Sequence, residues 1–217
     1  MTYDVIFTVG RMNPPTPGHA ILVKKLMEKG LQEGVQKVHI ILSSKVDSKK
    51  NPLEPEEKKY LLETYFLPRI RTELKKEMPY HHEAIDALHV NILLTHEFKK
   101  YSLNDVVSTI RYLLNGLGPK QRGLLIIGSP GFTDFPRVDI LLLDRKTLPI
   151  SGTIVRTIAH ISFDAFSKFY PGLHHKDISI IYDAIMLMEK PDEKLLLAAK
   201  VYLDAYSFYN LRSHKTI

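Results

Sequence analysis

The chain has 217 residues, with 30 Lys and Arg against 24 Asp and Glu for a formal charge of +6, and this length suits one compact domain. The absence of cysteine excludes a disulfide scaffold and a zinc site built on thiolates. No apolar run approaches the roughly 20 residues that cross a bilayer, and residues 1–10 do not resemble a secretory signal, so we expect a cytoplasmic protein. The positive charge favours anionic partners, either nucleic acids or nucleotides.

The first 43 residues predict a strand, a helix and a second strand. Residues 3–10 are apolar and β-branched and end at a glycine before a proline-rich loop, which predicts a buried strand. From about Gly18 to Lys29, apolar residues recur at three- and four-residue spacing, predicting an amphipathic helix that ends at Gly30. Residues 38–43 are apolar without alternation, as in a parallel strand covered on both faces.

The alternation of strands and helices continues along the chain. After a Lys-rich loop at residues 44–53, Pro55 and its acidic neighbours mark a helix that we expect to run past Tyr65 and to break near Pro68. Further strands are predicted at residues 88–94, 123–128 and 138–143, with a helix at 103–114, a short extended piece at 147–150 and a helix opening near Ser151. Residues 162–217 are predicted to be largely helical, with breaks near Pro171 and Pro191.

This order of elements predicts an α/β fold, namely a Rossmann-like doubly wound parallel sheet with helices on both faces and a helical C-terminal extension. We expect a single domain over residues 1–217, in which the helices of residues 161–217 pack on an α/β core of residues 1–160. In such sheets the ligand binds at the carboxyl ends of the strands. The loops after Gly10, Ser43, Gly128 and Ile150 are therefore the places to look for a site.

The loop from Gly10 to His19 joins the first strand to the first helix, where free backbone amides can meet a phosphate. Gly18 lets the backbone approach closely, Thr16 adds a hydroxyl, and His19 lies in the first turn of the helix. A Thr-x-Gly-His match arises by chance in about one chain in a hundred at average residue usage. A plain proline-rich turn is the alternative interpretation.

A second turn of the same kind lies far downstream, at residues 150–156. Ser151 and Thr153 supply hydroxyls at a helix start, and Arg156 follows about one turn later. Alone, this pattern is typical of an ordinary helix cap with a surface arginine. Two helix starts at neighbouring strand ends, each with hydroxyl and cationic donors, would together clamp one polyphosphate.

Both segments resemble signatures of the nucleotidyltransferase superfamily of the (H/T)xGH type. Residues 10–19, Gly-Arg-Met-Asn-Pro-Pro-Thr-Pro-Gly-His, match its first signature, and residues 150–156, Ile-Ser-Gly-Thr-Ile-Val-Arg, match its ISSTxxR signature in the right order. The resemblance covers roughly residues 3–170. Lys58 stands where the family usually has an arginine, which keeps the charge but loses the planar fork.

The resemblance implies transfer of AMP from ATP to a small phosphorylated acceptor, with release of pyrophosphate and no protein nucleophile. It also implies that His19 contacts the α-phosphate, that Thr16 hydrogen-bonds the same phosphate chain, and that Arg156 helps to hold the β- and γ-phosphates. Mg²⁺ is expected with ATP, held mainly by phosphate oxygens and water, and no protein metal site is expected. The candidate residues are catalytic His19, Thr16 and Arg156; nucleotide-binding Gly10, Arg11, Met12, Gly18, Gly128, Ile150, Ser151 and Thr153; and, in an acceptor or phosphate loop, Ser43, Ser44, Lys49 and Asn51.

The identity of the acceptor is left open by the residues themselves. Gly10 and Arg11 are similar to the opening of nicotinamide mononucleotide adenylyltransferases of the archaeal type, which slightly favours that acceptor, whereas Thr16 is similar to phosphopantetheine adenylyltransferases. Cytidylyl transfer to an alcohol phosphate is a third alternative. Departures from the family pattern at Met12 and Asn13 also allow a nucleotide-binding or interaction protein that has lost turnover.

Other signals are interpreted as structural. The His81-His82 and His174-His175 pairs are expected to be solvated, because adjacent residues on a helix point about 100° apart and rarely converge on one metal ion. Tyr202, Tyr206 and Tyr209 predict core packing or a contact in a homo-oligomer. Binding to nucleic acid is placed last, since no basic stripe is interleaved with aromatic residues.

Overall fold

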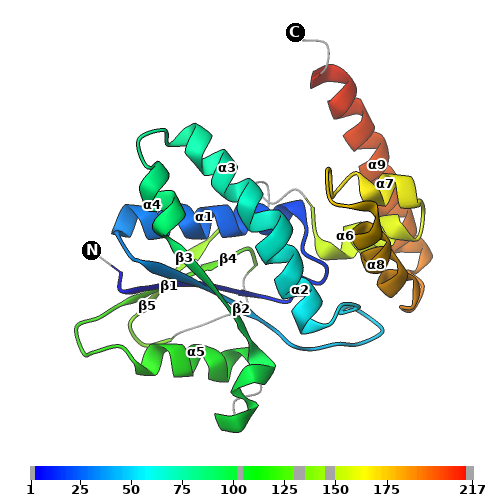
Figure 1. Ribbon diagram of the computed structural model, residues 1–217. Helices are drawn as coiled ribbons and strands as arrows, with labels where there is room; N and C mark the ends of the chain where they lie inside the picture. Colours follow the sequence, from blue (N-terminus) through cyan, green and yellow to red (C-terminus); the bar gives the residue numbers. More distant parts are fainter. Residues whose placement is uncertain (1–2, 102–104, 130–134, 145–149, 214–217) are drawn as a thin grey trace.

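The computed structural model describes residues 3–101, 105–129, 135–144 and 150–213 (Figure 1). Its centre is a five-stranded sheet in the order β3-β2-β1-β4-β5, in which all neighbouring strands are parallel. The strands are β1 (Val5–Gly10), β2 (Lys37–Leu42), β3 (His89–Leu94), β4 (Gly123–Ile127) and β5 (Val138–Leu142). The predicted Rossmann-like α/β fold is therefore confirmed.

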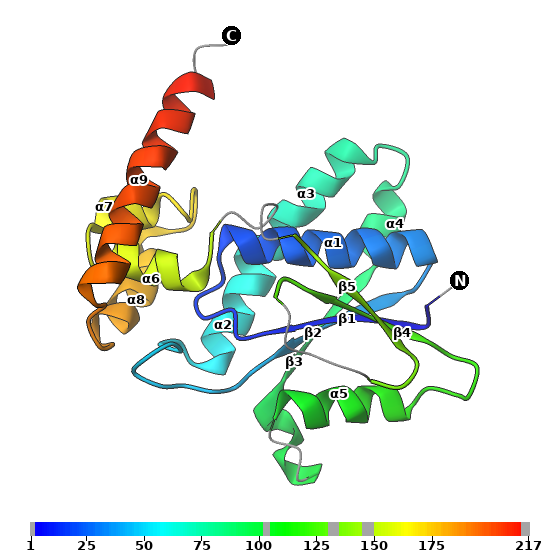
Figure 2. The ribbon, with the colours of Figure 1, turned by 180° about the vertical axis from the view of Figure 1, so that it is seen from behind.

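Helices cover both faces of the sheet (Figures 1 and 2). On one face lie α1 (Pro17–Glu33), α3 (Leu67–Glu77) and α4 (His82–Ala87), whereas α5 (Val106–Asn115) lies on the other. Successive residues of the strands pack into the two layers in turn: Ile40 belongs to the core cluster that includes α1 and α3, and Ile41 to the cluster that includes α5. Burial on both faces explains why the strands read as continuous apolar runs.

The first helix is one turn longer than predicted. The glycine expected to end it, Gly30, lies inside α1, where an added Cβ would meet a Val38 methyl at 2.6 Å. The helix ends instead at Gly34, which has a left-handed backbone with φ of 69°. Gly30 thus serves close packing of α1 on β2, and Gly34 is the residue with the conformation of a helix C-cap.

The expected break near Pro68 is wrong. Three helical segments follow one another without interruption: α2 (Pro55–Leu61), a π-helical turn η1 (Leu62–Phe66) and α3. Pro68 occupies the first turn of α3, directly after the π turn. The proline is tolerated there because the wider turn shifts the hydrogen-bond register just where an N–H is missing.

Other boundaries differ by a few residues from the predictions. Short helices that the pattern did not predict precede and follow β3, namely α4 and the 3₁₀ segment η2 (Thr95–Tyr101). The predicted extended piece at residues 147–150 lies almost wholly outside the described residues. Among the described residues, no helix is long and apolar enough to cross a bilayer.

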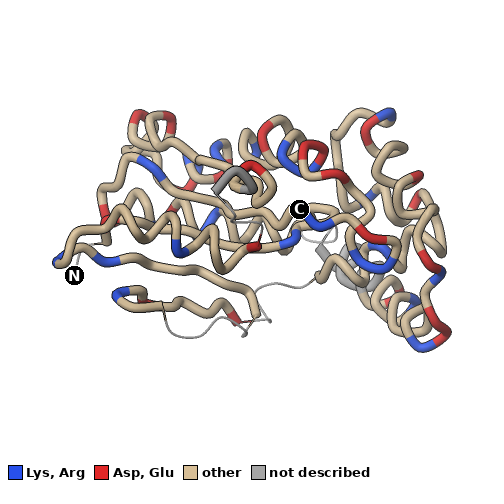
Figure 3. The backbone as a smooth tube through the Cα atoms, turned by 90° about the horizontal axis from the view of Figure 1, so that it is seen from below, with Lys and Arg blue, Asp and Glu red and all other residues tan. Residues whose placement is uncertain are grey.

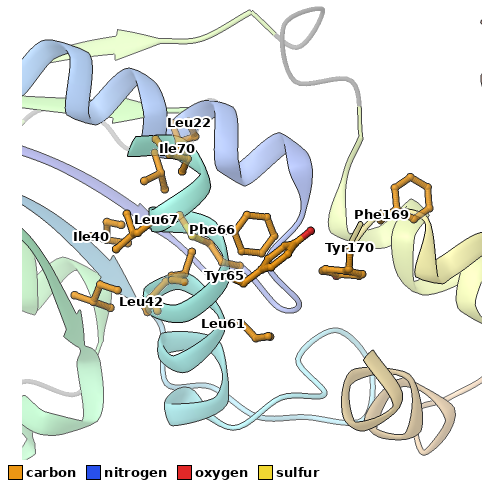
Figure 4. Packing of buried hydrophobic residues seen from close by; sticks show 14 of the residues in the cluster. Leu22, Ile40, Leu42, Leu61, Tyr65, Phe66, Leu67, Ile70, Phe169 and Tyr170 are labelled. Carbon is orange, nitrogen blue, oxygen red and sulfur yellow. The ribbon is translucent and has the colours of Figure 1, made fainter. Parts of the chain in front are cut away.

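The C-terminal part is helical, with the predicted breaks near Pro171 and Pro191 confirmed. It consists of α6 (Gly152–Ala159), α7 (Phe163–Ser167), α8 (His175–Met186) and α9 (Glu193–Ser213). The Tyr170 hydroxyl donates to the Pro15 carbonyl at 2.8 Å, and the Tyr170 ring packs 6.4 Å from the Phe66 ring of η1 (Figure 4). These buried contacts support the expectation of one domain, which stays a prediction.

Candidate active site

A cavity of about 580 Å³ opens at the carboxyl end of the sheet. Its wall combines the loop after β1, the starts of α1 and α6, the end of β2 and the residues that follow β4. The predicted site residues that line it are Gly10, Arg11, Met12, Gly18, His19, Ser43, Gly128, Ile150, Ser151, Thr153 and Arg156. The fold therefore brings both motifs, which are more than 130 residues apart, to one cavity.

The His19 ring is held by its neighbours so that one nitrogen remains for a ligand. The Thr16 amide donates to Nδ1 at 3.0 Å, which leaves the proton of the neutral ring on Nε2. Burial, with a smaller contribution from the Arg156 charge, lowers the pKa of His19 to about 4. In the free protein at neutral pH, His19 is thus an uncharged hydrogen-bond donor.

Arg156 reaches from α6 toward the loop after β1. Its Nη1 donates to the Asn13 carbonyl at 2.7 Å, and its Nη2 donates to the Thr153 hydroxyl at 3.3 Å. A Cβ added to Gly152 would lie 3.2 Å from Arg156 Nη1 and 4.0 Å from His19 Cε1, so the guanidinium and the imidazole both lie close to this glycine. Burial lowers the pKa of Arg156 to about 10, which keeps it cationic at neutral pH.

The close approach of the two motifs depends on Gly18. A Cβ at this position would lie 2.6 Å from the Ile150 carbonyl oxygen. That oxygen belongs to the backbone just before α6, so a rotamer change could not relieve the contact. The sequence prediction that Gly18 permits a close backbone approach fits this geometry, although the neighbour is the second motif itself.

Thr16 is not placed as the resemblance implied. Its side chain is fully buried and lies outside the cavity lining. Its hydroxyl is 2.8 Å from His19 Nδ1, at the N-cap of α1. The N-cap geometry turns Thr16 toward the helix start, so it holds the histidine ring rather than lining the space for a ligand.

Three candidates in the loop after β2 also lie outside the cavity lining. The Ser44 hydroxyl faces the other way, 2.9 Å from His96 Nδ1. Asn51 is buried and donates to the Asp47 carboxylate at 2.6 Å. Lys49 and its neighbour Lys50 are both exposed, and of the two it is Lys50 that lines the cavity. A Lys-Lys pair in a sequence does not show which of its two members borders a cavity.

Lys58 does not line the cavity either, although it lies directly behind the wall. Its side chain is fully buried, and its ammonium donates to the Ser43 carbonyl at 2.5 Å. Burial lowers the pKa of Lys58 to about 8. A single donor to one backbone carbonyl needs no planar fork, which accounts for a lysine at this position.

Asn13 also belongs to the site, although in the sequence it stands out only as a departure from the family pattern. It is buried, with both ends of its amide bound to the backbone of Leu53 at 2.9 Å. The preceding Met12 is buried and has a left-handed φ of 43°. An asparagine within a proline-rich loop was the signal in the sequence, but its partner lies 40 residues away.

We expect the protein to lose stability as the pH falls from 7 to 5. Burial lowers the pKa of His39 as well as that of His19 to about 4, whereas an unfolded histidine titrates near 6.5. Between these values the unfolded chain binds more protons than the folded one, so the free energy of unfolding falls, by on the order of 2 kcal/mol per ring at pH 5. Urea unfolding at both pH values measures the effect.

The control for this prediction is His39→Gln, which keeps a polar partner for the Asn91 amide. This variant should lose somewhat less than half of the pH dependence, since the His19 contribution is left together with a smaller one from His160, whose pKa burial also lowers. Equal stabilities of the unaltered protein at pH 7 and pH 5 would contradict the prediction.

Comparison with known proteins agrees with this geometry. A scan against family models matches residues 7–158, more than two thirds of the chain, to the cytidylyltransferase-like family. A search of curated proteins gave no match. The matched span runs from β1 to the end of α6 and contains both motifs. The chain belongs to the cytidylyltransferase-like family, and thus to the nucleotidyltransferase superfamily that its two motifs indicated.

Proposed function

We propose that the protein is an adenylyltransferase that transfers AMP from ATP to a small phosphorylated acceptor, with nicotinamide mononucleotide as the preferred candidate. The observation that carries this proposal is the convergence of His19 and Arg156 on one cavity, where both lie close to Gly152. A neutral N–H donor and a guanidinium in one polar cavity suit a chain of phosphates.

The chemistry needs no nucleophile from the protein. An oxygen of the acceptor phosphate forms a bond to the α-phosphorus while the bond to the bridging oxygen breaks, and pyrophosphate leaves with the electron pair. His19 donates from Nε2 to an α-phosphoryl oxygen, and Arg156 neutralises charge that develops on the leaving pyrophosphate. Thr16 keeps the imidazole in the donating tautomer. Catalysis consists of positioning and charge stabilisation.

The residues present fit a Mg²⁺ ion that arrives with the nucleotide. The described residues that line the cavity include Arg11, Lys50 and Arg156 but no carboxylate, so the protein itself offers few ligands for a hard cation. Bound to the triphosphate, the ion would neutralise part of its charge. The cationic side chains of Arg11, Lys50 and Arg156 would balance the rest of the phosphate charge.

Cytidylyl transfer is the second candidate, because the matched family model is described as cytidylyltransferase-like. Transfer to phosphopantetheine is an alternative acceptor for the same adenylyl chemistry. A nucleic-acid partner is not favoured: in the described part of the chain, Lys and Arg are interspersed with Asp and Glu along the helices (Figure 3).

Pyrophosphate release tests these candidates directly. ATP or CTP is mixed with Mg²⁺ and, in turn, with nicotinamide mononucleotide, phosphopantetheine and alcohol phosphates. Release with ATP and nicotinamide mononucleotide is the expected result. Release with CTP alone would replace the proposal by the cytidylyl reaction, and tight ATP binding without release for any acceptor would identify a protein that has kept the site and lost turnover.

A further inference from the structure

Asn13 joins two parts of the cavity wall that are far apart in the sequence. Its Nδ2 donates to the Leu53 carbonyl, and its Oδ1 accepts from the Leu53 amide, both at 2.9 Å. Its own carbonyl accepts the 2.7 Å hydrogen bond from Arg156. Because Asn13 is only 3% exposed, water competes little for these bonds.

The segment that ends at Leu53 carries Lys50 on a tightly closed turn. The Asp47 carboxylate accepts from the Lys49 and Lys50 amides at 2.9 and 2.6 Å. It also accepts from the Asn51 side chain at 2.6 Å, while the Asp47 amide donates to the Asn51 carbonyl at 3.0 Å. These bonds make residues 47–51 a compact unit, and Leu53, fully buried two residues later, fixes its end.

The charge of Asp47 in this turn acts on Arg156. The Asp47 carboxylate favours the charged form of Arg156 and so partly opposes the lowering of its pKa by burial. Lys50 and Arg156 both line the cavity. Asn13 therefore holds the turn that carries Lys50, through its side-chain hydrogen bonds to Leu53, and it holds Arg156 through its main-chain carbonyl.

We propose that Asn13 is a positioning residue that sets Lys50 and Arg156 at a fixed spacing, so that both cations bind one phosphate tail together. The inference rests on the proposed function only in taking a polyphosphate as the ligand. Phosphates of one tail lie at fixed separations, whereas lysine and arginine side chains are flexible and lose conformational entropy when they are ordered. A rigid frame lowers that cost and raises affinity without adding a contact to the ligand.

The test is a double-mutant cycle on the binding of inorganic tripolyphosphate, measured by calorimetry in the full chain with Mg²⁺. Lys50→Ala should weaken binding by about 10-fold, the scale of one lost charge-assisted hydrogen bond. In the Asn13→Ala background, the same Lys50→Ala change should cost less than about 3-fold, because the turn that carries the lysine is no longer tied to the loop after β1. Full additivity of the two changes would overturn the inference.

A control cycle and a second variant separate positioning from loss of folding. Lys120→Ala alters an exposed lysine outside the cavity lining, and its small effect should be the same in both backgrounds. If Asn13→Ala does not fold, Asn13→Asp takes its place in the cycle. It keeps the side-chain size and an acceptor for the Leu53 amide, so it should retain part of the coupling between residues 13 and 50. Faster hydrogen exchange at the Leu53 amide in Asn13→Ala would report, without any ligand, the loss of the hydrogen bonds between the Asn13 side chain and Leu53.

The outcomes also separate this inference from the proposed function. Coupled tripolyphosphate binding without pyrophosphate release from any nucleotide would leave the inference standing and end the proposed reaction. Pyrophosphate release together with additive effects in the mutant cycle would leave the proposed reaction standing and end the inference. Failure of the unaltered protein to bind tripolyphosphate would overturn the inference.

Discussion

We expect His19→Ala to lower turnover by roughly 10²-fold or more, the range observed when one preorganised donor to a developing oxyanion is removed. The imidazole is fixed before any ligand binds, because the Thr16 amide occupies Nδ1. The lost donor acts at the reacting phosphorus, so the loss should fall on kcat more than on KM. Steady-state pyrophosphate release with the best acceptor measures both constants.

The matched control is His81→Ala, which alters an exposed histidine outside the cavity lining. It should change turnover by less than about twofold, as expected for surface substitutions away from the chemistry. Because the pKa of His19 in the free protein lies near 4, the His19 contribution to kcat/KM should also be flat between pH 6 and 8. Near-normal turnover in His19→Ala would refute its assigned role.

Gly18→Ala should lower turnover almost as much as His19→Ala, although it removes no functional group. The new methyl would lie 2.6 Å from the Ile150 carbonyl oxygen, and neither backbone can move without shifting the other. The start of α6 must then move away from α1, which separates His19 from Arg156. We expect a loss in turnover on the order of 10²-fold, the scale of an error of about 1 Å in positioning.

Gly116→Ala provides the comparison for this prediction. The nearest atom to a Cβ at Gly116 is the Leu113 carbonyl oxygen at 3.9 Å, and the backbone has an ordinary φ of −75°. This substitution should leave turnover unchanged and stabilise the fold by about 0.4–1 kcal/mol, because alanine restricts the unfolded chain. A Gly18→Ala protein as active as Gly116→Ala would show that the spacing of the two motifs is not critical.

Much of the fold followed from local patterns. The parallel strands are apolar on both faces, so each appears in the sequence as a short continuous run of apolar residues between turn residues. The helix boundaries were less predictable because they depend on packing. The sequence predicts a helix end at Gly30, yet this residue lies inside α1 against Val38. Pro68 follows a π turn that no residue pattern predicts.

The sequence by itself determined the fold class, the strand ends at which a ligand would bind, and the two motifs with His19 and Arg156, since these depend on residue type and short-range spacing. Tertiary structure decided which neighbours of the motifs face the cavity. It turned Thr16 toward His19, placed Lys50 rather than Lys49 in the cavity lining, and gave Asn13 a hydrogen-bond partner 40 residues away. The direction of a side chain in a loop is set by hydrogen bonds to distant backbone, and a linear pattern does not contain those partners.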